Sequence, residues 1–353
     1  MPLLTRMIGA PLSIDIGSGT VKQLAPLLAD RRISAGGHVA VIVGPGLGEE
    51  IAEALRPELA NAALWTLEDG GGVEVAYDLA KRLRAGFYDA VVGIGGGRTL
   101  DVSKLVSTLS GLPMVAVATS LAHDGIASPV AALEEGGRKG SYGVQMPIAL
   151  VVDLDYVRRS DPEMRRSGIG DTVSNLSAIA DWYLAERERG ESVDGVAVTF
   201  ARMAATAVMH REDGIDDDDF LVTLAEALVL SGLAMASVGS SRPCSGGDHE
   251  IIHAIDHLFP GTARHGELAG ACSLFCAELR EDAAMARAID ACLRRHGLPR
   301  TPADLGLSEE QFAQAVLHAP STRPDRYTVL ERLGLDAEGV RGRVRAFLDA
   351  FDR

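Results

Sequence analysis

The order of apolar segments along the chain constrains its fold more than any other feature of the sequence. Up to about residue 155, short continuous apolar runs alternate with amphipathic segments of helical length. Fully apolar strands separated by such helices predict a parallel sheet that is covered on both faces. The expected strands are residues 38–44, 63–68, 88–95, 113–120 and 148–155, and the expected helices include residues 48–59 and 73–86.

The strand pattern stops at about residue 160. The remainder has the pattern of helices, and a chain of 353 residues is long enough for two domains. We therefore predict an α/β domain over residues 1–158, with a Rossmann-like parallel sheet, followed by an all-helical domain over residues 159–353. Helices are expected in the second domain at residues 171–188, 195–210, 220–238 and 338–351.

The composition excludes some classes of function. The 34 basic and 49 acidic residues give a formal charge of −15, and no basic tract is longer than an Arg-Arg pair, so we expect no nucleic-acid partner. An anionic small-molecule substrate would need cations gathered locally against this charge. The sequence contains no uninterrupted apolar run of bilayer length, so we expect no membrane insertion.

The cysteines and the N-terminal segment indicate a location. The first residues carry one arginine and no sustained apolar core, which is unlike a signal peptide. The four cysteines form no C-x-x-C pair, and we expect them to be reduced residues of the core. Both features predict a cytoplasmic protein. The cysteines are Cys244, Cys272, Cys276 and Cys292.

A glycine-rich turn follows one of the expected strands. Residues 88–106 read YDAVVGIGGGRTLDVSKLV, which is strand, glycines and helix in that order. Glycines allow a pyrophosphate to approach the backbone, and the helix start supplies N–H donors. The pattern G-x-G-x-x-G is not met, because Arg98 stands where its last glycine belongs. The turn alone therefore leaves two interpretations open, a dinucleotide site and a tight connection.

The segment His249-Glu250-x-x-His253 matches H-E-x-x-H, the zinc motif of many metalloproteases. The metzincin form would need glycine where this chain has Asp256 and histidine where it has Phe259. A protease would also leave the glycine turn and the N-terminal half without a purpose. The sequence therefore disfavours a protease.

A second set of metal ligands is possible. His249 and His265 lie sixteen residues apart, with a Pro-Gly break between them, and Asp171 follows Gly168 and Gly170 where we expect a helix to start. A catalytic zinc site takes about three protein ligands and leaves one position open. Asp171 is equally expected as a helix N-cap, and His249, His253 and His257 as one polar helix face. Spacing alone does not decide between these interpretations.

Five ordered segments carry a resemblance that covers residues from about 10 to about 280. They are 95-GGGRTLDVSK-104, 123-HDGIASP-129, 168-GIGDTVSNLSAIADWYLA-185, 239-GSSRPCSGGDHEIIHAID-256 and 265-HGE-267. Together they resemble the glycerol-1-phosphate dehydrogenases, within the superfamily of dehydroquinate synthases and iron-dependent alcohol dehydrogenases. The resemblance implies a metal site in the cleft between the two domains, a nicotinamide dinucleotide and one divalent metal. Zinc is expected, with nickel or iron as alternatives.

The resemblance also assigns residues by position. Asp171, His249 and His265 stand where the family has its metal ligands, and His253 and Asp124 where it contacts substrate. Glu250 departs from the family as we know it, which has an apolar side chain there. The residues at the positions that hold the dinucleotide are Gly95, Gly96, Gly97, Arg98, Thr99, Asp101, Thr119, Ser120, Leu121, Ala122 and Ser128.

The activity implied is the interconversion of dihydroxyacetone phosphate and sn-glycerol 1-phosphate, or of a closely related phosphorylated or phosphonylated ketone. His253, one turn after His249, is placed to exchange the alcohol proton or to hold a substrate oxygen. Arg242, beside Ser240 and Ser241, is our candidate for the phosphate, with a surface ion pair as its alternative.

Three rival functions stay open at this point. A dehydroquinate-synthase-like cyclase would carry lysines after the position of Asp124, where this chain has Ala127-Ser128-Pro129. A general polyol or glycerol dehydrogenase would share the fold, and a non-catalytic sensor would have a broken metal triad. NADH and NADPH are both possible, because no carboxylate ends the segment 38–46. We expect a homo-oligomer.

Overall fold

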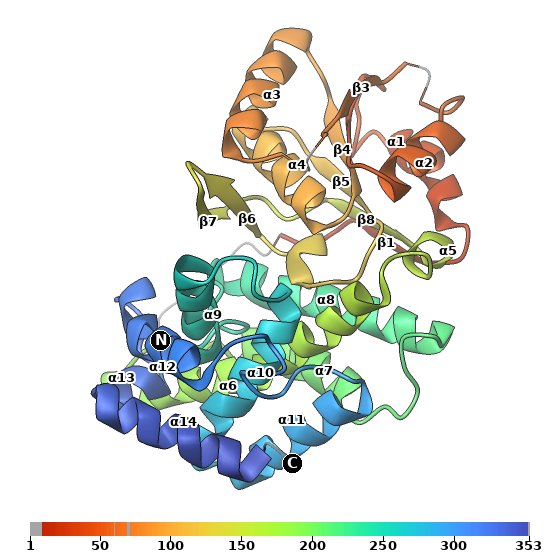
Figure 1. Cartoon of the computed structure of the whole chain (residues 1–353). Coiled ribbons are helices and arrows are strands. Elements are labelled where there is room, and N and C mark those ends of the chain that lie inside the picture. Colours follow the sequence, from red (N-terminus) through yellow and green to blue (C-terminus); the bar gives the residue numbers. More distant parts are fainter. Residues whose placement is uncertain (1–8, 60, 69–70, 352–353) are drawn as a thin grey trace, which may run out of the picture. The chain divides into compact units, whose positions relative to one another are not determined.

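A computed structural model of the chain describes residues 9–59, 61–68 and 71–351. Contacts within it divide the chain into two compact units (Figure 1). One runs to Pro162 and takes in Met235–Gly239, and the other holds Glu163–Ala234 and the chain from Ser240 onward. Strands occur only in the first unit among the described residues, as the apolar pattern predicted.

The first unit contains a six-stranded parallel sheet of order β1-β8-β5-β4-β2-β3. All five predicted strands are confirmed, and the four inner ones are fully buried, which explains their continuous apolar sequence. The strand β1 was not predicted, because its sequence SIDIG is interrupted by polar residues and the strand is only partly buried. The strands are β1 (Ser13–Gly17), β2 (Val39–Val43), β3 (Ala63–Thr66), β4 (Ala90–Gly95), β5 (Met114–Ala118) and β8 (Ala149–Asp153).

Helices cover both faces of this sheet (Figure 1). The helices α1 (Leu24–Leu28) and α2 (Leu47–Ala54) share a hydrophobic core with alternate residues of the inner strands. The helices α3 (Val73–Gly86) and α4 (Gly97–Ser110) lie on the opposite side. The first unit is thus the doubly covered α/β layer that was expected, although α2 ends five residues before the predicted end.

A two-stranded antiparallel hairpin was missed by the sequence analysis. It consists of β6 (Val130–Glu135) and β7 (Arg138–Gly143). Strand β7 (RKGSYG) is polar and β6 (VAALEE) is apolar only in its first four residues, so the hairpin lacks the pair of apolar runs that would have marked it. Their two-residue loop, Gly136-Gly137, has positive φ at both positions, which is the geometry that hairpin turns favour. The Gly-Gly pair was the one available signal.

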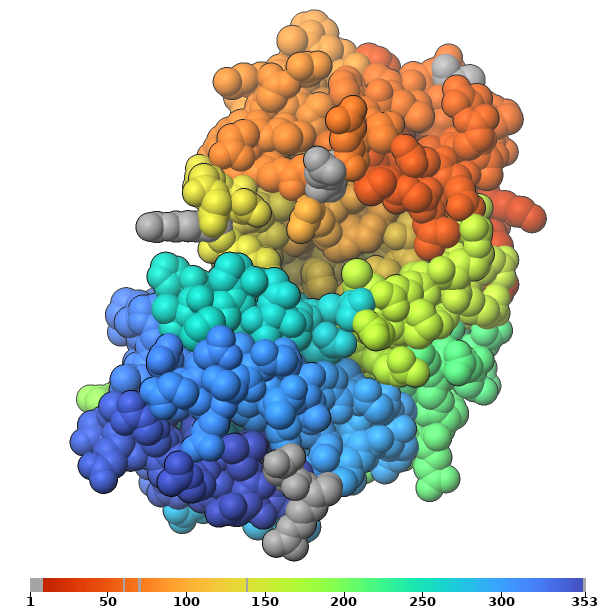
Figure 2. Space-filling view, in the orientation of Figure 1, coloured from red at the N-terminus to blue at the C-terminus, as the bar shows by residue number. Residues whose placement is uncertain are grey.

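The second unit is helical throughout its described residues. Helix α6 begins nine residues earlier than predicted, because Pro162 suits a first helical position. Helix α14 forms part of the surface of this unit (Figure 2). The long helices are α6 (Pro162–Arg189), α7 (Gly195–Met209), α8 (Asp218–Val238), α9 (Gly247–Leu258), α10 (His265–Leu279), α11 (Ala283–Arg295), α12 (Glu309–His318) and α14 (Ala337–Phe351).

One helix in the described part of the chain, α8, is long and apolar enough to cross a membrane by length and composition alone. No segment of membrane-spanning length was expected from the sequence. Within α8, 61% of the most apolar window is buried inside the protein, as in a core helix. All four cysteines are likewise buried and unpaired, which confirms that they are core residues.

Candidate metal and substrate site

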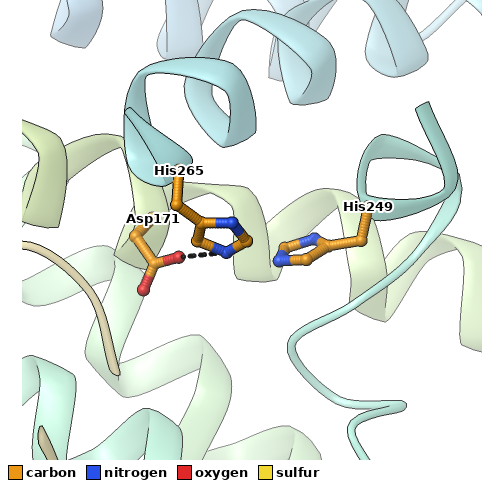
Figure 3. Close-up of side chains that lie close together, drawn as sticks. All are labelled: Asp171, His249 and His265. Atoms are coloured by element: carbon orange, nitrogen blue, oxygen red, sulfur yellow. Dashed lines mark ion pairs between the residues drawn. The ribbon is translucent and has the colours of Figure 1, made fainter. Parts of the chain in front are cut away.

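Three side chains from three helices of the second unit meet in one cluster (Figure 3). They are Asp171 on α6, His249 on α9 and His265 on α10, and one ligand atom of each lies within 4.8 Å of the others. The His265 Nε2 atom lies 3.4 Å from Asp171 Oδ1, and the two imidazole centroids are 5.2 Å apart. The structure therefore brings together the three residues that the family resemblance grouped.

Close packing of α6 against α10 explains why two of these residues meet. A Cβ atom at Gly266 would overlap the carbonyl oxygen of Ser167, and one at Gly170 would overlap that of Gly266. The two helix backbones can touch only because both positions lack a side chain. Since Gly170 precedes Asp171 and Gly266 follows His265, this crossing fixes the carboxylate beside the imidazole.

The predicted position of Asp171 at a helix start is wrong. Helix α6 begins at Pro162, so Asp171 lies in its interior, in the third turn. An N-cap role is therefore excluded for this residue. Its side chain is only 4% exposed, and burial of a carboxylate is costly unless a positive partner or a metal compensates it.

His249 is oriented by the residue before it. Its Nδ1 atom lies 3.0 Å from Oδ2 of Asp248, whose side chain is fully buried and also accepts a hydrogen bond from the Gly246 N–H. A carboxylate accepts, so Nδ1 carries the proton and Nε2 presents its lone pair. This carboxylate-histidine arrangement is typical of metal-binding imidazoles.

The donor set fits a divalent transition metal. Two imidazoles and one carboxylate are the ligands that zinc, nickel and iron accept, and three protein ligands leave a position for substrate. The fixed tautomer of His249 and the burial of Asp171 are features that such an ion requires.

Glu250 and His253, the other members of the H-E-x-x-H pattern, take no part in this cluster. Glu250 is fully buried, and its Oε2 atom accepts a hydrogen bond from the Thr328 hydroxyl at 3.1 Å. Burial, with a contribution from Glu331, raises the pKa of Glu250 to about 9. A carboxyl that is protonated at neutral pH is no general base, so the protease interpretation has no support.

His253 lies beside the cluster and contacts an arginine that the sequence analysis had not considered. Its Nε2 atom accepts a hydrogen bond from Nη2 of Arg323 at 2.9 Å. Burial first, then the charge of Arg323 and the two other imidazoles, lowers the pKa of His253 to about 2. The ring is therefore neutral, and its remaining proton is on Nδ1.

Arg242 has partners within the protein. Its guanidinium forms an ion pair with Glu191 at 2.9 Å and donates to the carbonyls of Asp181 and Tyr327. Its side chain is 5% exposed. The prediction of a cation available for substrate phosphate does not match this arrangement, because the charge is already neutralised by a carboxylate.

The glycine turn of the first unit joins β4 to α4 as predicted. Gly96 is the residue before α4, and a Cβ atom there would meet nothing closer than the Ser120 and Thr119 hydroxyls, at 3.7 and 4.0 Å. The structure thus brings Gly96, Ser120 and Thr119 close together, and a Cβ atom at Gly96 would be in ordinary van der Waals contact with the two hydroxyls. His123 was missed, and it packs directly against Gly97. Arg98 is exposed, whereas Thr99, Leu121 and Ala122 are buried.

Two further predicted dinucleotide residues are bonded to a buried lysine. Lys104 forms an ion pair with Asp101 at 2.8 Å and donates to the carbonyl of Ser128. The second oxygen of Asp101 accepts a hydrogen bond from the Ala132 N–H. This network ties α4 to the β6–β7 hairpin. Asp124, a predicted substrate contact, lies in the short helix η2 (Asp124–Ile126).

The fold and the cluster define the class of the protein. Residues 15–160 match the model of the iron-containing alcohol dehydrogenases. A solved structure described as a probable glycerol dehydrogenase from Sinorhizobium meliloti 1021 has a TM-score of 0.78 and 22% identity, and the match covers 98% of this chain and 99% of that one. At this identity the likeness shows the shared fold.

Two curated relatives narrow the class to a family. A protein of Archaeoglobus fulgidus is 40% identical over 256 residues, or 70% of this chain and 73% of its own length. One of Cenarchaeum symbiosum is 32% identical over 344 residues, or 95% of this chain and 94% of its own. Both are named glycerol-1-phosphate dehydrogenase (NAD(P)+). The chain belongs to the glycerol-1-phosphate dehydrogenase family.

Proposed function

We propose that this protein interconverts dihydroxyacetone phosphate and sn-glycerol 1-phosphate with NAD(H) or NADP(H), in a reaction that needs one divalent metal. The observation that carries the proposal is the cluster of Asp171, His249 and His265 in a member of this family. Zinc is the metal we expect, and nickel or iron would fit the same ligands.

We also propose which part of the chain binds the dinucleotide and which part holds the metal and the substrate. Residues 1–158 would bind the dinucleotide, with the turn at Gly95–Thr99, the segment Thr119–Ala122, Asp101 and Ser128 around it. Residues 159–353 would hold the metal and, through His253, contact the substrate together with Asp124. The turn supplies backbone N–H groups at the start of α4 for the pyrophosphate.

A divalent ion bound by the cluster would polarise the substrate carbonyl, and the nicotinamide would supply the hydride. The protein's own residues hold these groups in place. The Asp248 carboxylate fixes the His249 ring, and the α6–α10 crossing fixes Asp171 against His265. Because the His253 ring is neutral with its proton on Nδ1, it donates a hydrogen bond to a substrate oxygen, a role that suits it better than accepting a proton.

The cellular setting is a proposal as well. Four buried, unpaired cysteines suit the reducing cytoplasm, where we expect the protein to act as a homo-oligomer on a small phosphorylated substrate.

The test is a reductase assay of the purified protein on dihydroxyacetone phosphate, with both cofactors and several divalent metals. We expect Asp171→Ala, His249→Ala and His265→Ala each to lose bound metal and to lower kcat/KM by about a thousandfold or more, since a metal contributes several kcal/mol to the transition state. Metal content is measured beside the rate. His257→Ala is the matched control, because His257 is an exposed histidine on the same helix as His249.

The outcome that contradicts the proposal is a wild-type protein that prefers unphosphorylated dihydroxyacetone. That result would leave a metal-dependent polyol dehydrogenase. Retention of metal by all three variants would remove the ligand assignment.

A further inference from the structure

Two arginines of the second unit converge on one serine beside the metal cluster. Arg323 and Arg326 lie between η3 (Ala319–Thr322) and α13 (Val329–Leu333). Nη1 of Arg323 lies 3.5 Å, and Nη2 of Arg326 3.3 Å, from the hydroxyl of Ser241. Arg326 also donates to the carbonyl of Ser245. Both side chains are half-buried. Both guanidinium groups lie within 3.5 Å of the Ser241 hydroxyl.

Neither guanidinium has a carboxylate in ion-pair contact among the described residues. Within the described part of the chain, neither Arg323 nor Arg326 forms an ion pair, although the chain carries a formal charge of −15. Asp325 is an exposed carboxylate of the same segment and pairs with neither arginine. Glu250 and Asp325 raise the pKa values of both arginines through their charge, but among the described residues neither carboxyl group forms an ion pair with them. Two guanidinium groups therefore meet at one hydroxyl without a carboxylate in direct contact.

This arrangement lowers the pKa values of both arginines. Burial lowers the pKa of Arg323. Burial, with the charges of Arg323 and Arg242, lowers the pKa of Arg326 to about 10. Arg242 differs from this pair because Glu191 compensates it. An anion bound between Arg323 and Arg326 would remove the repulsion, and guanidinium groups suit the oxygens of a phosphate better than any other side chain.

The pair is also connected to the reacting centre. Arg323 donates directly to Nε2 of His253, and His253 is one helical turn after the metal-cluster residue His249. A group held by the arginines is thus one imidazole away from the cluster. This is the relation that a short phosphorylated ketone needs between its phosphate and its carbonyl.

We propose that Arg323 and Arg326, with the Ser241 hydroxyl between them, bind the phosphate of the substrate, in place of the Arg242 expected from sequence. Arg323 has a second task, which is to orient His253 so that Nδ1–H points to the substrate. The identity of the phosphate ester rests on the proposed function. The anion site itself rests on the pair of arginines.

The experiment compares kcat/KM for dihydroxyacetone phosphate and for dihydroxyacetone in wild type, Arg323→Gln and Arg326→Gln at one ionic strength. Loss of a charge-assisted hydrogen bond lowers kcat/KM for the phosphorylated ketone by about ten- to a hundredfold. Arg326→Gln is expected to lower kcat/KM for the phosphorylated ketone by a much larger factor than kcat/KM for the unphosphorylated one. Arg323→Gln lowers kcat/KM for both ketones, because it also releases His253.

A matched control and a second readout complete the test. Arg332→Gln removes a nearby exposed guanidinium that is paired with Glu188, so it corrects for long-range attraction. Calorimetric titration of the metal-loaded protein with inorganic phosphate reports binding without turnover, and we expect both variants to lose it. Should Arg326→Gln fail to fold, Arg326→Lys keeps the charge but loses the planar fork, and it is expected to bind phosphate more weakly.

Failure of the proposed function and failure of the anion site would give different results. Wild type that binds inorganic phosphate through these arginines but does not reduce dihydroxyacetone phosphate would overturn the proposed function and leave the anion site. Wild type that reduces dihydroxyacetone phosphate, with kcat/KM and phosphate binding the same in Arg326→Gln as in the Arg332→Gln control, would overturn the anion site and leave the proposed function.

Discussion

Glycine is used in two different ways at the two parts of this protein that matter most. At the β4–α4 turn of the first unit, a Cβ atom on Gly96 would meet its nearest protein neighbour at 3.7 Å, an ordinary van der Waals distance. At the α6–α10 crossing of the second unit, a Cβ atom on Gly170 or Gly266 would overlap a backbone carbonyl oxygen. The crossing thus needs glycine for the protein's own packing, whereas the turn could take a Cβ atom without displacing its neighbours. This difference predicts which substitutions damage the fold and which damage binding.

The largest effect is expected at the crossing. Gly266→Ala places a methyl group against the Ser167 carbonyl, and neither backbone can move without shifting a helix that carries a residue of the Asp171, His249 and His265 cluster. We expect the free energy of unfolding to fall by more than about 3 kcal/mol, with loss of metal binding. Urea unfolding followed by circular dichroism measures it.

The control for this substitution is Gly342→Ala on α14, where nothing lies within 4 Å of the added atom. That variant is expected to gain stability slightly, since alanine favours helix by up to about 1 kcal/mol. If the two glycine variants unfolded at the same urea concentration, the crossing would not depend on Gly266.

The second effect is expected at the turn, and it concerns the cofactor. Gly96→Val puts a branched side chain where the pyrophosphate is proposed to approach, while its φ of −80° suits any residue. We expect affinity for NADH and NADPH to fall by about a hundredfold or more, because a steric block removes the phosphate contacts worth several kcal/mol. Stability without cofactor should change by less than about 1 kcal/mol.

Two measurements separate the loss of cofactor affinity from any loss of stability. Cofactor affinity is obtained from the fluorescence change on titration with the reduced dinucleotide, and stability from thermal unfolding without it. Equal cofactor affinity in wild type and Gly96→Val would show that the pyrophosphate does not approach the backbone at Gly96.

The fold was predictable because its signals are local. Each inner strand is a continuous apolar run, and that run follows directly from burial on both faces. The β6–β7 hairpin was missed because β7 is polar and β6 is apolar only in its first four residues, and the Gly136-Gly137 pair alone marked the turn.

The site was predictable in part, because its members are far apart in sequence. Spacing could not choose between His253 and His265 as partners of His249, since that choice depends on how α10 crosses α6. The family resemblance supplied the grouping. The same limit explains the choice of Arg242: its partner Glu191 is 51 residues away, and no pattern joins them. Arg323, 70 residues from His253, was not considered for the same reason.

The smallest effect is expected at Glu250, where the H-E-x-x-H pattern and the structure give opposite roles to one carboxyl. Its pKa of about 9 in the folded protein compares with about 4.3 in an unfolded chain. Between these values the folded protein holds a proton that the unfolded chain has lost, so this group makes stability fall as pH rises from about 4.5 to about 9.

Glu250→Gln removes that proton uptake and keeps the side-chain shape. We expect the free energy of unfolding to rise by about 1–3 kcal/mol at pH 8 and by much less at pH 5, because the cost of burying the acid is avoided. Urea unfolding from pH 5 to pH 9 should give a flatter profile than wild type. Glu338→Gln, which changes an exposed glutamate on α14, is the control and should leave the profile within about 0.5 kcal/mol of wild type.

Glu250→Gln should retain metal content and reductase activity, since Glu250 bonds to Thr328 and lies outside the cluster. Parallel pH profiles for wild type and Glu250→Gln would mean that the buried carboxyl is ionised, and loss of activity in that variant would return Glu250 to the chemistry of the site.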